Sequence, residues 1–202
     1  MDARIQAVID ELHARIKREM DQIGKGQGFD INQLALAAGP DTAGFLNLLI
    51  RTMGARRIVE VGTSIGYTAL WLGEAARATG GRVIGMEAVE AKYQQALVHI
   101  ARAGLTDVIE VRLGDAKQIV KDISGPIDLV FLDAWKDDYV TYFDVLLSKL
   151  RLGGCIIADN ITYPESFRET MRRYQAHVRS YPNVRSHLLT IGNGEEMSVR
   201  IA

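Results

Sequence analysis

The stretch RIVEVGTSIGYT, residues 57–68, decides the fold of this 202-residue chain. Ile58–Val61 form a short, mostly apolar run that predicts a buried β-strand, and an apolar helical pattern begins after Gly66. Gly62 and Gly66 permit a tight turn and a close approach of the backbone to another group. In an open α/β sheet, ligands bind outside the carboxyl ends of the strands. We therefore expect a ligand at this turn.

The alternation of strand and helix continues downstream. Apolar runs predict strands at Ile58–Val61, Val83–Met86, Val108–Leu113, Ile127–Leu132 and Cys155–Ala158. Helical patterns lie at Thr68–Ala78, Ala91–Ala103, Ala116–Ile123, Val140–Leu150 and Glu165–Ala176. Such an order implies a mostly parallel sheet with right-handed crossovers. The end of the chain departs from it, because Val184–Ile191 and Glu195–Ile201 flank a glycine turn and predict an antiparallel hairpin. We predict a Rossmann-like, doubly wound α/β fold with a seven-stranded sheet.

The length suits a single domain, residues 1–202, in which residues 1–38 precede a core of residues 39–202. The first segment predicts an amphipathic helix with apolar residues at Ile5, Val8, Ile9, Leu12, Ile16 and Met20. This stripe suits either a homodimer interface, which we expect, or packing on the chain's own core. A lid-like hinge is predicted at Gly24, Gly26 and Gly28. Pro40 opens a second helix, expected to present Phe45, Leu48, Leu49 and Met53.

Composition excludes several classes of protein. The formal net charge is -1 with both signs interspersed, so no overall basic field for nucleic acid is expected. A local cluster of arginines, which we expect to be a solvated helix face, comprises Arg168, Arg172, Arg173, Arg179 and Arg185. The single cysteine, Cys155, lies in an apolar run and predicts a buried thiol rather than a disulfide. Neither a signal peptide nor a membrane helix is expected, and we predict a cytoplasmic protein.

Two acidic residues narrow the choice of ligand. Glu60 lies inside the apolar strand before the turn, where a carboxylate is costly unless it has a partner. Glu87 ends the next strand, where an acidic group accepts the ribose hydroxyls of an adenosine. NAD would also suit Glu87, but the dinucleotide fingerprint requires a glycine at the position of Ser64 to admit a pyrophosphate. We predict S-adenosylmethionine, whose ammonium group Glu60 would attract.

Further polar side chains follow the fourth and fifth predicted strands. Asp133 and Lys136 come after one strand, and Asp159 and Asn160 after the other. Carboxylate and amide oxygens are the ligands that Mg²⁺ prefers. The alternative is that these residues cap the helices that follow. Because both strand ends open on the edge that carries the cofactor turn, we predict a metal site there.

These residues resemble the cation-dependent O-methyltransferases, the catechol and caffeoyl-coenzyme A O-methyltransferase family, especially its compact bacterial members. The resemblance runs from about Gly39 to the final hairpin, and rests on residues 59–67, residues 132–139 and the Asp159-Asn160 pair. It implies that Asp133, Asp159 and Asn160 bind Mg²⁺ and that Lys136 is the general base. It also implies a cofactor site lined by Glu60, Gly62, Ser64, Gly66, Thr68, Glu87, Ala116 and Asp133.

The resemblance predicts a Mg²⁺-dependent transfer of the methyl group of S-adenosylmethionine to a hydroxyl of a vicinal dihydroxy aromatic compound. Lys136, Trp135 and Tyr163 would contact this acceptor, although packing is an open alternative for both aromatic residues. Ala134 departs from the family, since the catechol enzymes have a histidine there. Their substrate-binding glutamate has no clear counterpart; Glu195 and Glu196 fall at the final hairpin, where they are expected at the surface unless one of them fills that role.

Three other functions stay open. A tRNA hydroxyuridine O-methyltransferase would need a basic rim, for which the arginine cluster is the place to look. An NAD-dependent oxidoreductase is opposed by the glycine spacing and by the predicted metal ligands. A domain that only binds the cofactor would not need Asp133, Lys136, Asp159 and Asn160.

Overall fold

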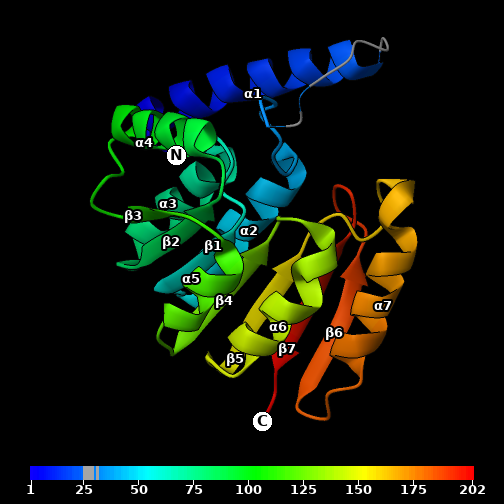
Figure 1. The fold of residues 1–202 in the computed structure, drawn as a ribbon. Coiled ribbons are helices and arrows are strands. Elements are labelled where there is room, and N and C mark those ends of the chain that lie inside the picture. Colours follow the sequence, from blue (N-terminus) through cyan, green and yellow to red (C-terminus); the bar gives the residue numbers. More distant parts are fainter. Residues whose placement is uncertain (25–29, 31) are drawn as a thin grey trace.

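The computed structural model describes residues 1–24, 30 and 32–202 and is built on one seven-stranded sheet (Figure 1). The strands lie in the order β3-β2-β1-β4-β5-β7-β6. Their bounds are β1 Arg57–Val61, β2 Arg82–Glu87, β3 Ile109–Leu113, β4 Ile127–Leu132, β5 Leu150–Ala158, β6 Val184–Leu189 and β7 Glu195–Arg200. The first five strands are parallel, whereas β7 runs antiparallel to both β5 and β6. This confirms the predicted sheet and its final hairpin.

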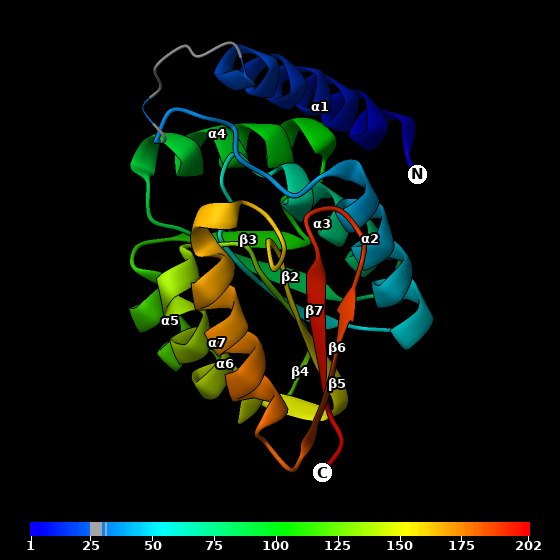
Figure 2. The same ribbon diagram turned by 90° about the vertical axis from the view of Figure 1, so that its right-hand side faces the viewer.

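Helices cover both faces of the sheet (Figure 2). One face carries α1 Ala3–Gly24, α2 Pro40–Met53, α3 Tyr67–Thr79 and α4 Glu90–Ala103. The other carries α5 Ala116–Asp122, α6 Tyr139–Leu147 and α7 Arg168–Arg179. The strand order reverses direction between β1 and β4, which neighbour each other, and this is where an open α/β sheet forms its ligand crevice. None of the described helices is long and apolar enough to cross a lipid bilayer.

Two predicted boundaries beside β5 are wrong. The helix predicted at Val140–Leu150 ends at Leu147, and Leu150 begins a strand that was predicted to start at Cys155. The reason is pairing across the sheet, because Leu150 lies opposite Ile127 of β4. The amide of Ile127 donates a hydrogen bond to the carbonyl of Lys149 at 2.9 Å, which draws the chain into the sheet early.

Helix α1 packs on its own chain. Its buried residues are Ile5, Val8, Ile9 and Leu12, and it contacts α3 and α4, while Met20 is exposed. The apolar stripe therefore gives no support to a dimer, which stays a prediction. Of the predicted hinge, Gly24 ends α1, and Gly26 and Gly28 lie outside the described residues.

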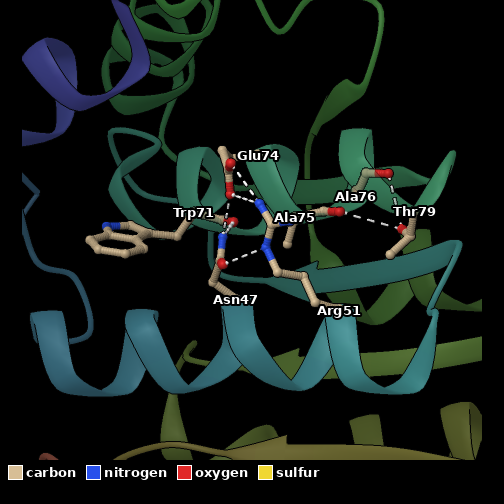
Figure 3. A network of polar contacts seen from close by, with 7 residues as sticks. All are labelled: Asn47, Arg51, Trp71, Glu74, Ala75, Ala76 and Thr79. Atoms are coloured by element: carbon tan, nitrogen blue, oxygen red, sulfur yellow. Dashed lines mark hydrogen bonds and ion pairs between the residues drawn. The ribbon is translucent and has the colours of Figure 1, made fainter. Parts of the chain in front are cut away.

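Helix α2 buries most of the predicted face, but not all of it. Phe45, Leu49 and Met53 are partly buried against the core, Leu46 and Ile50 lie fully inside it, and Leu48 is 66% exposed. The spacing of apolar residues does not predict this arrangement in full, because the polar Asn47 is also buried. Its Nδ2 donates to the carbonyl of Trp71 and to Glu74 on α3, each at 2.8 Å (Figure 3). This polar clamp fixes α2 against α3.

Candidate functional site

The turn after β1 holds a buried carboxyl group without full hydrogen bonding. Glu60 is fully buried, and its Oε2 accepts a hydrogen bond from the Thr63 hydroxyl at 2.8 Å. Its Oε1 has no partner among the described residues. Burial, assisted by the charges of Asp133 and Glu87, raises the pKa of Glu60 to about 8. An unpaired buried carboxylate of this kind is stabilised by a cationic ligand.

The glycines of the turn allow two close backbone approaches. At Gly62, with φ of 100°, a Cβ would lie 2.2 Å from the carbonyl oxygen of Asp133. Gly66, with φ of 92°, lies against Ala96 of α4. The lack of a side chain at Gly62 therefore allows the ends of β1 and β4 to lie in contact. Ser64 adopts a φ of 49°, its hydroxyl oxygen is buried without a partner among the described residues, and no glycine opens this position to a pyrophosphate.

Glu87, at the end of the neighbouring strand β2, stabilises the turn after β1 through hydrogen bonds. Its Oε2 accepts from the amide of Ser64 and its Oε1 from the amide of Val89, both at 2.8 Å. Each oxygen keeps a lone pair for a further donor. Thr68 is buried in the first turn of α3. The structure thus brings Glu60, Ser64, Thr68 and Glu87 together around one turn.

Ala116 is the first residue of α5, after the end of β3. The side chain of Asp115 accepts a hydrogen bond from the amide of Lys117 at 2.9 Å. Asp115 therefore caps α5. Ala116 is half-buried beside the edge of the sheet that carries Glu87.

The ends of β4 and β5 bring the predicted metal ligands to the same edge. Asp133 follows β4, and Asp159 and Asn160 follow β5, with Asn160 in the left-handed region at φ of 64°. The hydroxyl of Tyr139, on α6, donates to the carbonyl of Leu132 at 3.0 Å and lies 3.3 Å from that of Asp159. This buried phenol ties the two strand ends together.

The carboxyl groups at these strand ends are buried and repel each other. Burial raises the pKa of Asp159 to about 7, with the charge of Asp133 adding to the shift. Burial also raises the pKa of Asp133, against the opposing effect of Lys136. In the described part of the chain, no group of three or more His, Cys, Asp or Glu side chains is arranged to hold a metal ion. A metal site here depends on the amide oxygen of Asn160 beside two carboxylates, an all-oxygen set that suits Mg²⁺.

Lys136 lies next to the same carboxylates. Its Nζ donates to Oδ1 of Asp133 at 3.1 Å and to the carbonyl of Ala134 at 2.9 Å. It also lies 5.3 Å from the centre of the Tyr139 ring. The amine is largely buried and held at the strand end, which is the position that a proton acceptor for a bound hydroxyl requires.

Aromatic side chains border this part of the edge. Trp135 and Tyr163 are 57% and 58% exposed, so neither is a core residue. Trp135 packs edge-on against Phe167, with ring centres 5.5 Å apart. Phe167 was missed by the sequence analysis, because a lone aromatic residue at the start of a helix carries no signal of its own. Exposed aromatic faces suit the stacking of a planar ring.

The hairpin contributes residues that the sequence analysis placed wrongly. Glu195 and Glu196 were expected at the surface, yet both are fully buried. Glu196 forms an ion pair with Arg179 at 2.8 Å. Glu195 contacts Asp159 and accepts a hydrogen bond from the hydroxyl of Thr42 at 2.8 Å. Because β7 is antiparallel to β5, its first residue lies at the edge where β5 ends, and this topological signal places Glu195 beside Asp159.

Of two hollows in the described surface, the smaller lies nearer to these residues. The larger, of about 490 Å³, lies at the opposite edge of the sheet among Arg56, Arg57 and Arg82. The smaller, of about 200 Å³, is lined by Ile161 and Thr162, which directly follow Asn160. The convergence of carboxylates, rather than the size of a hollow, therefore defines the candidate site.

The arginine cluster does not form a continuous basic rim. Three of its members pair with acidic residues, in the pairs Arg168 with Glu165, Arg173 with Glu169 and Arg179 with Glu196. Only Arg172 and Arg185 lack a carboxylate partner in the described part of the chain.

The chain combines a Rossmann-like sheet with a glycine turn and a cluster of carboxyl groups at the carboxyl ends of its strands. The family model described as O-methyltransferase matches residues 17–201. The chain belongs to this O-methyltransferase family.

Relatives agree with this assignment. Catechol O-methyltransferase of Niastella koreensis is 37% identical over 131 residues, which are 63% of this chain and 59% of that protein. Caffeoyl-CoA O-methyltransferase 1 of Zea mays is 32% identical over 72% of this chain and 60% of that protein. The chain thus spans less than two thirds of the length of these curated relatives.

Solved structures are similar over a larger share. The O-methyltransferase of Bacillus cereus, in complex with SAH, has 29% identity and a TM-score of 0.77, covering 96% of this chain and 90% of that one. The O-methyltransferase TomG of Streptomyces achromogenes, in complex with SAM, has 26% identity and a TM-score of 0.79, covering 100% and 91%.

Proposed function

We propose that this protein transfers the methyl group of S-adenosylmethionine to a hydroxyl of a catechol-type small molecule in a Mg²⁺-dependent reaction. The observation that carries the proposal is one sheet edge at which Glu60, buried with one oxygen lacking a partner among the described residues, neighbours the cluster of Asp133, Asp159 and Lys136. A cationic methyl donor suits Glu60, and a divalent ion with an acidic hydroxyl suits the cluster.

On the donor side, the proposed roles follow the contacts of the turn. Glu60 attracts the ammonium group of the donor, and Glu87 accepts the ribose hydroxyls with its remaining lone pairs. Further contacts to the donor come from Gly62, Ser64, Gly66, Thr68, Ala116 and Asp133. The neighbours solved with SAH and SAM support a donor of this type.

On the acceptor side, Asp133, Asp159 and Asn160 are the residues that would hold Mg²⁺. When bound, such an ion lowers the pKa of a hydroxyl that it contacts. Trp135 and Tyr163 would hold the aromatic ring through their exposed faces. The relatives named catechol and caffeoyl-CoA O-methyltransferases support an aromatic acceptor.

Lys136 would act as the general base. Its neutral amine takes the proton of the attacking hydroxyl onto Nζ. The deprotonated oxygen of the acceptor forms a bond to the methyl carbon. The carbon–sulfur bond of the donor breaks, and the electron pair of that bond stays on sulfur. The contacts of Lys136 with Asp133 and Ala134 hold the amine in place for this step. Alignment of oxygen, methyl and sulfur by the rest of the site supplies up to about 7–11 kcal/mol of the barrier reduction.

A transfer assay tests this proposal. Purified protein is incubated with labelled methyl donor and a panel of catechols, flavonoids and hydroxylated tRNA. We expect label on a catechol or flavonoid, loss of transfer in EDTA, and recovery with added Mg²⁺. Transfer that persists in EDTA would exclude the metal role, and label on tRNA alone would favour the alternative acceptor.

The tRNA hydroxyuridine O-methyltransferase is the second candidate, but the arrangement of charges gives it little support. A nucleic-acid acceptor needs unpaired cations along its path. In the cluster, only Arg172 and Arg185 are without a carboxylate partner among the described residues.

We also propose that residues 1–202 act as one methyltransferase domain in the cytoplasm, without a nucleic-acid or membrane partner. The free, buried thiol of Cys155 accords with a reducing compartment. A homodimer remains a prediction from the family, to be tested by light scattering of the purified protein.

A further inference from the structure

The larger hollow, of about 490 Å³, lies at the edge of the sheet opposite the candidate site, and the proposed reaction does not use it. It is formed at the amino ends of β1, β2 and β3, where Arg56, Arg57 and Arg82 line it. Its volume lies in the range of pockets that hold small molecules. The hollow is therefore large enough for a second ligand, and its arginines indicate an anionic one.

The pairing of the strands places these arginines side by side. Arg57 of β1 lies opposite Arg82 of β2 in the parallel register, so the two side chains leave the same face of the sheet. Arg56 precedes β1, and its carbonyl accepts a hydrogen bond from the amide of Arg82 at 2.7 Å. Like charges on directly opposite residues of neighbouring strands repel each other. An anion between the guanidinium groups would remove this repulsion.

The three arginines form no ion pair with a carboxylate in the part of the chain that the structure describes. Asp128 is bonded to the backbone of the same segment, because its Oδ2 accepts from the amides of Arg56 and Arg57 at 2.9 and 2.7 Å. Its other oxygen, Oδ1, is paired with Arg151. The charge of Asp128 is thus matched by Arg151, and the guanidinium groups in the hollow keep their positive charge.

Arg57 holds a buried donor without an acceptor. Its Nη2 donates to the hydroxyl of Ser124 at 2.8 Å, which fixes the side chain. Its Nε is buried and has no hydrogen-bond partner among residues 1–24, 30 and 32–202. A buried donor without an acceptor is costly, whereas an arginine that served only solubility would keep this group in water. Guanidinium groups bind the oxygens of a phosphate through paired N–H donors, and Arg57 offers such a donor.

Acidic residues at the same hollow narrow the class of ligand. Asp107 and Glu110 line it, and Glu110 also pairs with Arg112 at 2.6 Å. Carboxylates accept hydrogen bonds from hydroxyl groups. They repel a chain of phosphates, which needs cations along its whole path. This combination suits a small molecule with one phosphate and several hydroxyl groups, and it opposes a nucleic-acid strand.

We propose that this hollow is a binding site for a phosphorylated small molecule of the sugar-phosphate type. The guanidinium groups of Arg56, Arg57 and Arg82 bind its phosphate. Asp107 and Glu110 accept hydrogen bonds from its hydroxyl groups. The inference goes beyond the proposed methyl transfer and does not depend on it, because none of these residues belongs to the candidate site.

Isothermal titration calorimetry of the full chain with ribose 5-phosphate tests the inference. EDTA and saturating S-adenosylhomocysteine are present, so that neither a metal ion nor the donor site can hold the probe. We expect one binding site, and a loss of roughly ten- to a hundredfold in affinity in Arg57→Gln and in Arg82→Gln. Arg173→Gln is the matched control, because it makes the same change of charge at an exposed ion pair on α7. It should bind like the unaltered chain.

Thermal unfolding separates a loss of binding from a loss of structure. Arg82 is exposed, so Arg82→Gln should unfold at the same temperature as the unaltered chain in the absence of ligand. Ribose 5-phosphate should raise the Tm of the unaltered chain, and it should raise that of the variant less. If Arg57→Gln and Arg82→Gln both fold and bind ribose 5-phosphate as tightly as the unaltered chain, the inference is wrong.

The probes also decide between classes of ligand. Absence of ribose 5-phosphate binding to the unaltered chain would overturn the inference, and so would an equal affinity for ribose, which carries no phosphate. Tighter binding of a single-stranded oligonucleotide, lost in Arg82→Gln, would assign the hollow to nucleic acid instead. If methyl transfer fails while ribose 5-phosphate still binds, the proposed function alone is overturned.

Discussion

The two halves of the sheet edge differ in the hydrogen-bond donors that they offer to buried carboxyl groups. At the end of β2, Glu87 accepts hydrogen bonds from the amides of Ser64 and Val89, so backbone donors stabilise its charge. At the ends of β5 and β7, the carboxyl groups of Asp159 and Glu195 lie against each other, and they accept hydrogen bonds from the amide of Asn160 and the hydroxyl of Thr42 respectively. On the donor side the chain itself supplies donors to Glu87 and leaves one oxygen of Glu60 without a partner among the described residues, whereas on the acceptor side buried carboxyl groups lie against one another and raise each other's pKa.

The two sides also differ in how far apart in the sequence their residues lie. The donor turn is formed by residues 60–68 with one fastening from Glu87, all within two neighbouring strands. The acceptor side combines β4, β5, β7 and α2, which lie far apart in the sequence. Substitutions on one side should therefore leave the binding function of the other side intact, and this separation can be tested.

The largest effect is expected at Lys136 on the acceptor side. The variant Lys136→Met removes the amine but keeps most of the apolar stem. We expect kcat to fall by roughly 10²–10⁴-fold, the usual contribution of a general base. Donor affinity, measured by isothermal titration calorimetry with S-adenosylhomocysteine, should stay within about twofold, because the site of Glu60 and Glu87 is untouched.

A matched control for this variant is Lys117→Met. Lys117 pairs with Asp138 at 3.2 Å, next to Lys136, but is more exposed. Its substitution should change kcat by less than about threefold, since exposed ion pairs contribute little. Equal losses in the two variants would contradict a specific role for Lys136.

A smaller effect is expected at Glu60 on the donor side. The variant Glu60→Gln removes the charge that we propose for the ammonium group of the donor. A charge-assisted hydrogen bond of about 1.5–3 kcal/mol predicts a loss of roughly ten- to a hundredfold in S-adenosylhomocysteine affinity by calorimetry. Mn²⁺ affinity should hardly change. A loss of Mn²⁺ binding equal to the loss of donor binding would show that the two sides are not separate.

The last effect concerns folding rather than catalysis or binding, and is a dependence of stability on pH. Burial raises the pKa of Glu60 from 4.5 to about 8 in the absence of donor. Between these values the folded protein retains a proton that the unfolded chain releases, so the free energy of unfolding falls as the pH rises and levels off above about 8. Urea unfolding at pH 5, 6.5 and 8 should show a shallower decline for Glu60→Gln than for the unaltered chain. Parallel declines would place the titration elsewhere.

The sequence predicts the donor side well because its determinants are local. An apolar strand, two glycines and Glu60 lie within ten residues, and the structure brings these residues together with Glu87 as expected. The parallel strands and their helices are predictable for the same reason, since each is a short apolar run or a periodic pattern. The boundary at Leu150 is not, because pairing with Ile127 overrides a helical pattern.

The acceptor side could be predicted only in part. Asp133, Lys136, Asp159 and Asn160 follow strands whose carboxyl ends meet at one edge, so their convergence was expected. Glu195 and Glu196 look like exposed residues because they open a short strand next to a glycine turn. Their burial depends on α2, α7 and the hairpin coming together, through contacts to Thr42 and Arg179, and no local pattern encodes such contacts.

Tyr139 acts as a strut across the acceptor side. Its single hydroxyl proton lies between the carbonyls of Leu132 and Asp159, so a rigid ring in the core sets how far apart the ends of β4 and β5 lie. The core of the protein, and not a bound ion, then sets the distance between Asp133 and Asp159. Loops such as those bearing Trp135 and Tyr163 can therefore vary with the shape of the acceptor, while the distance across which the chemistry takes place is kept.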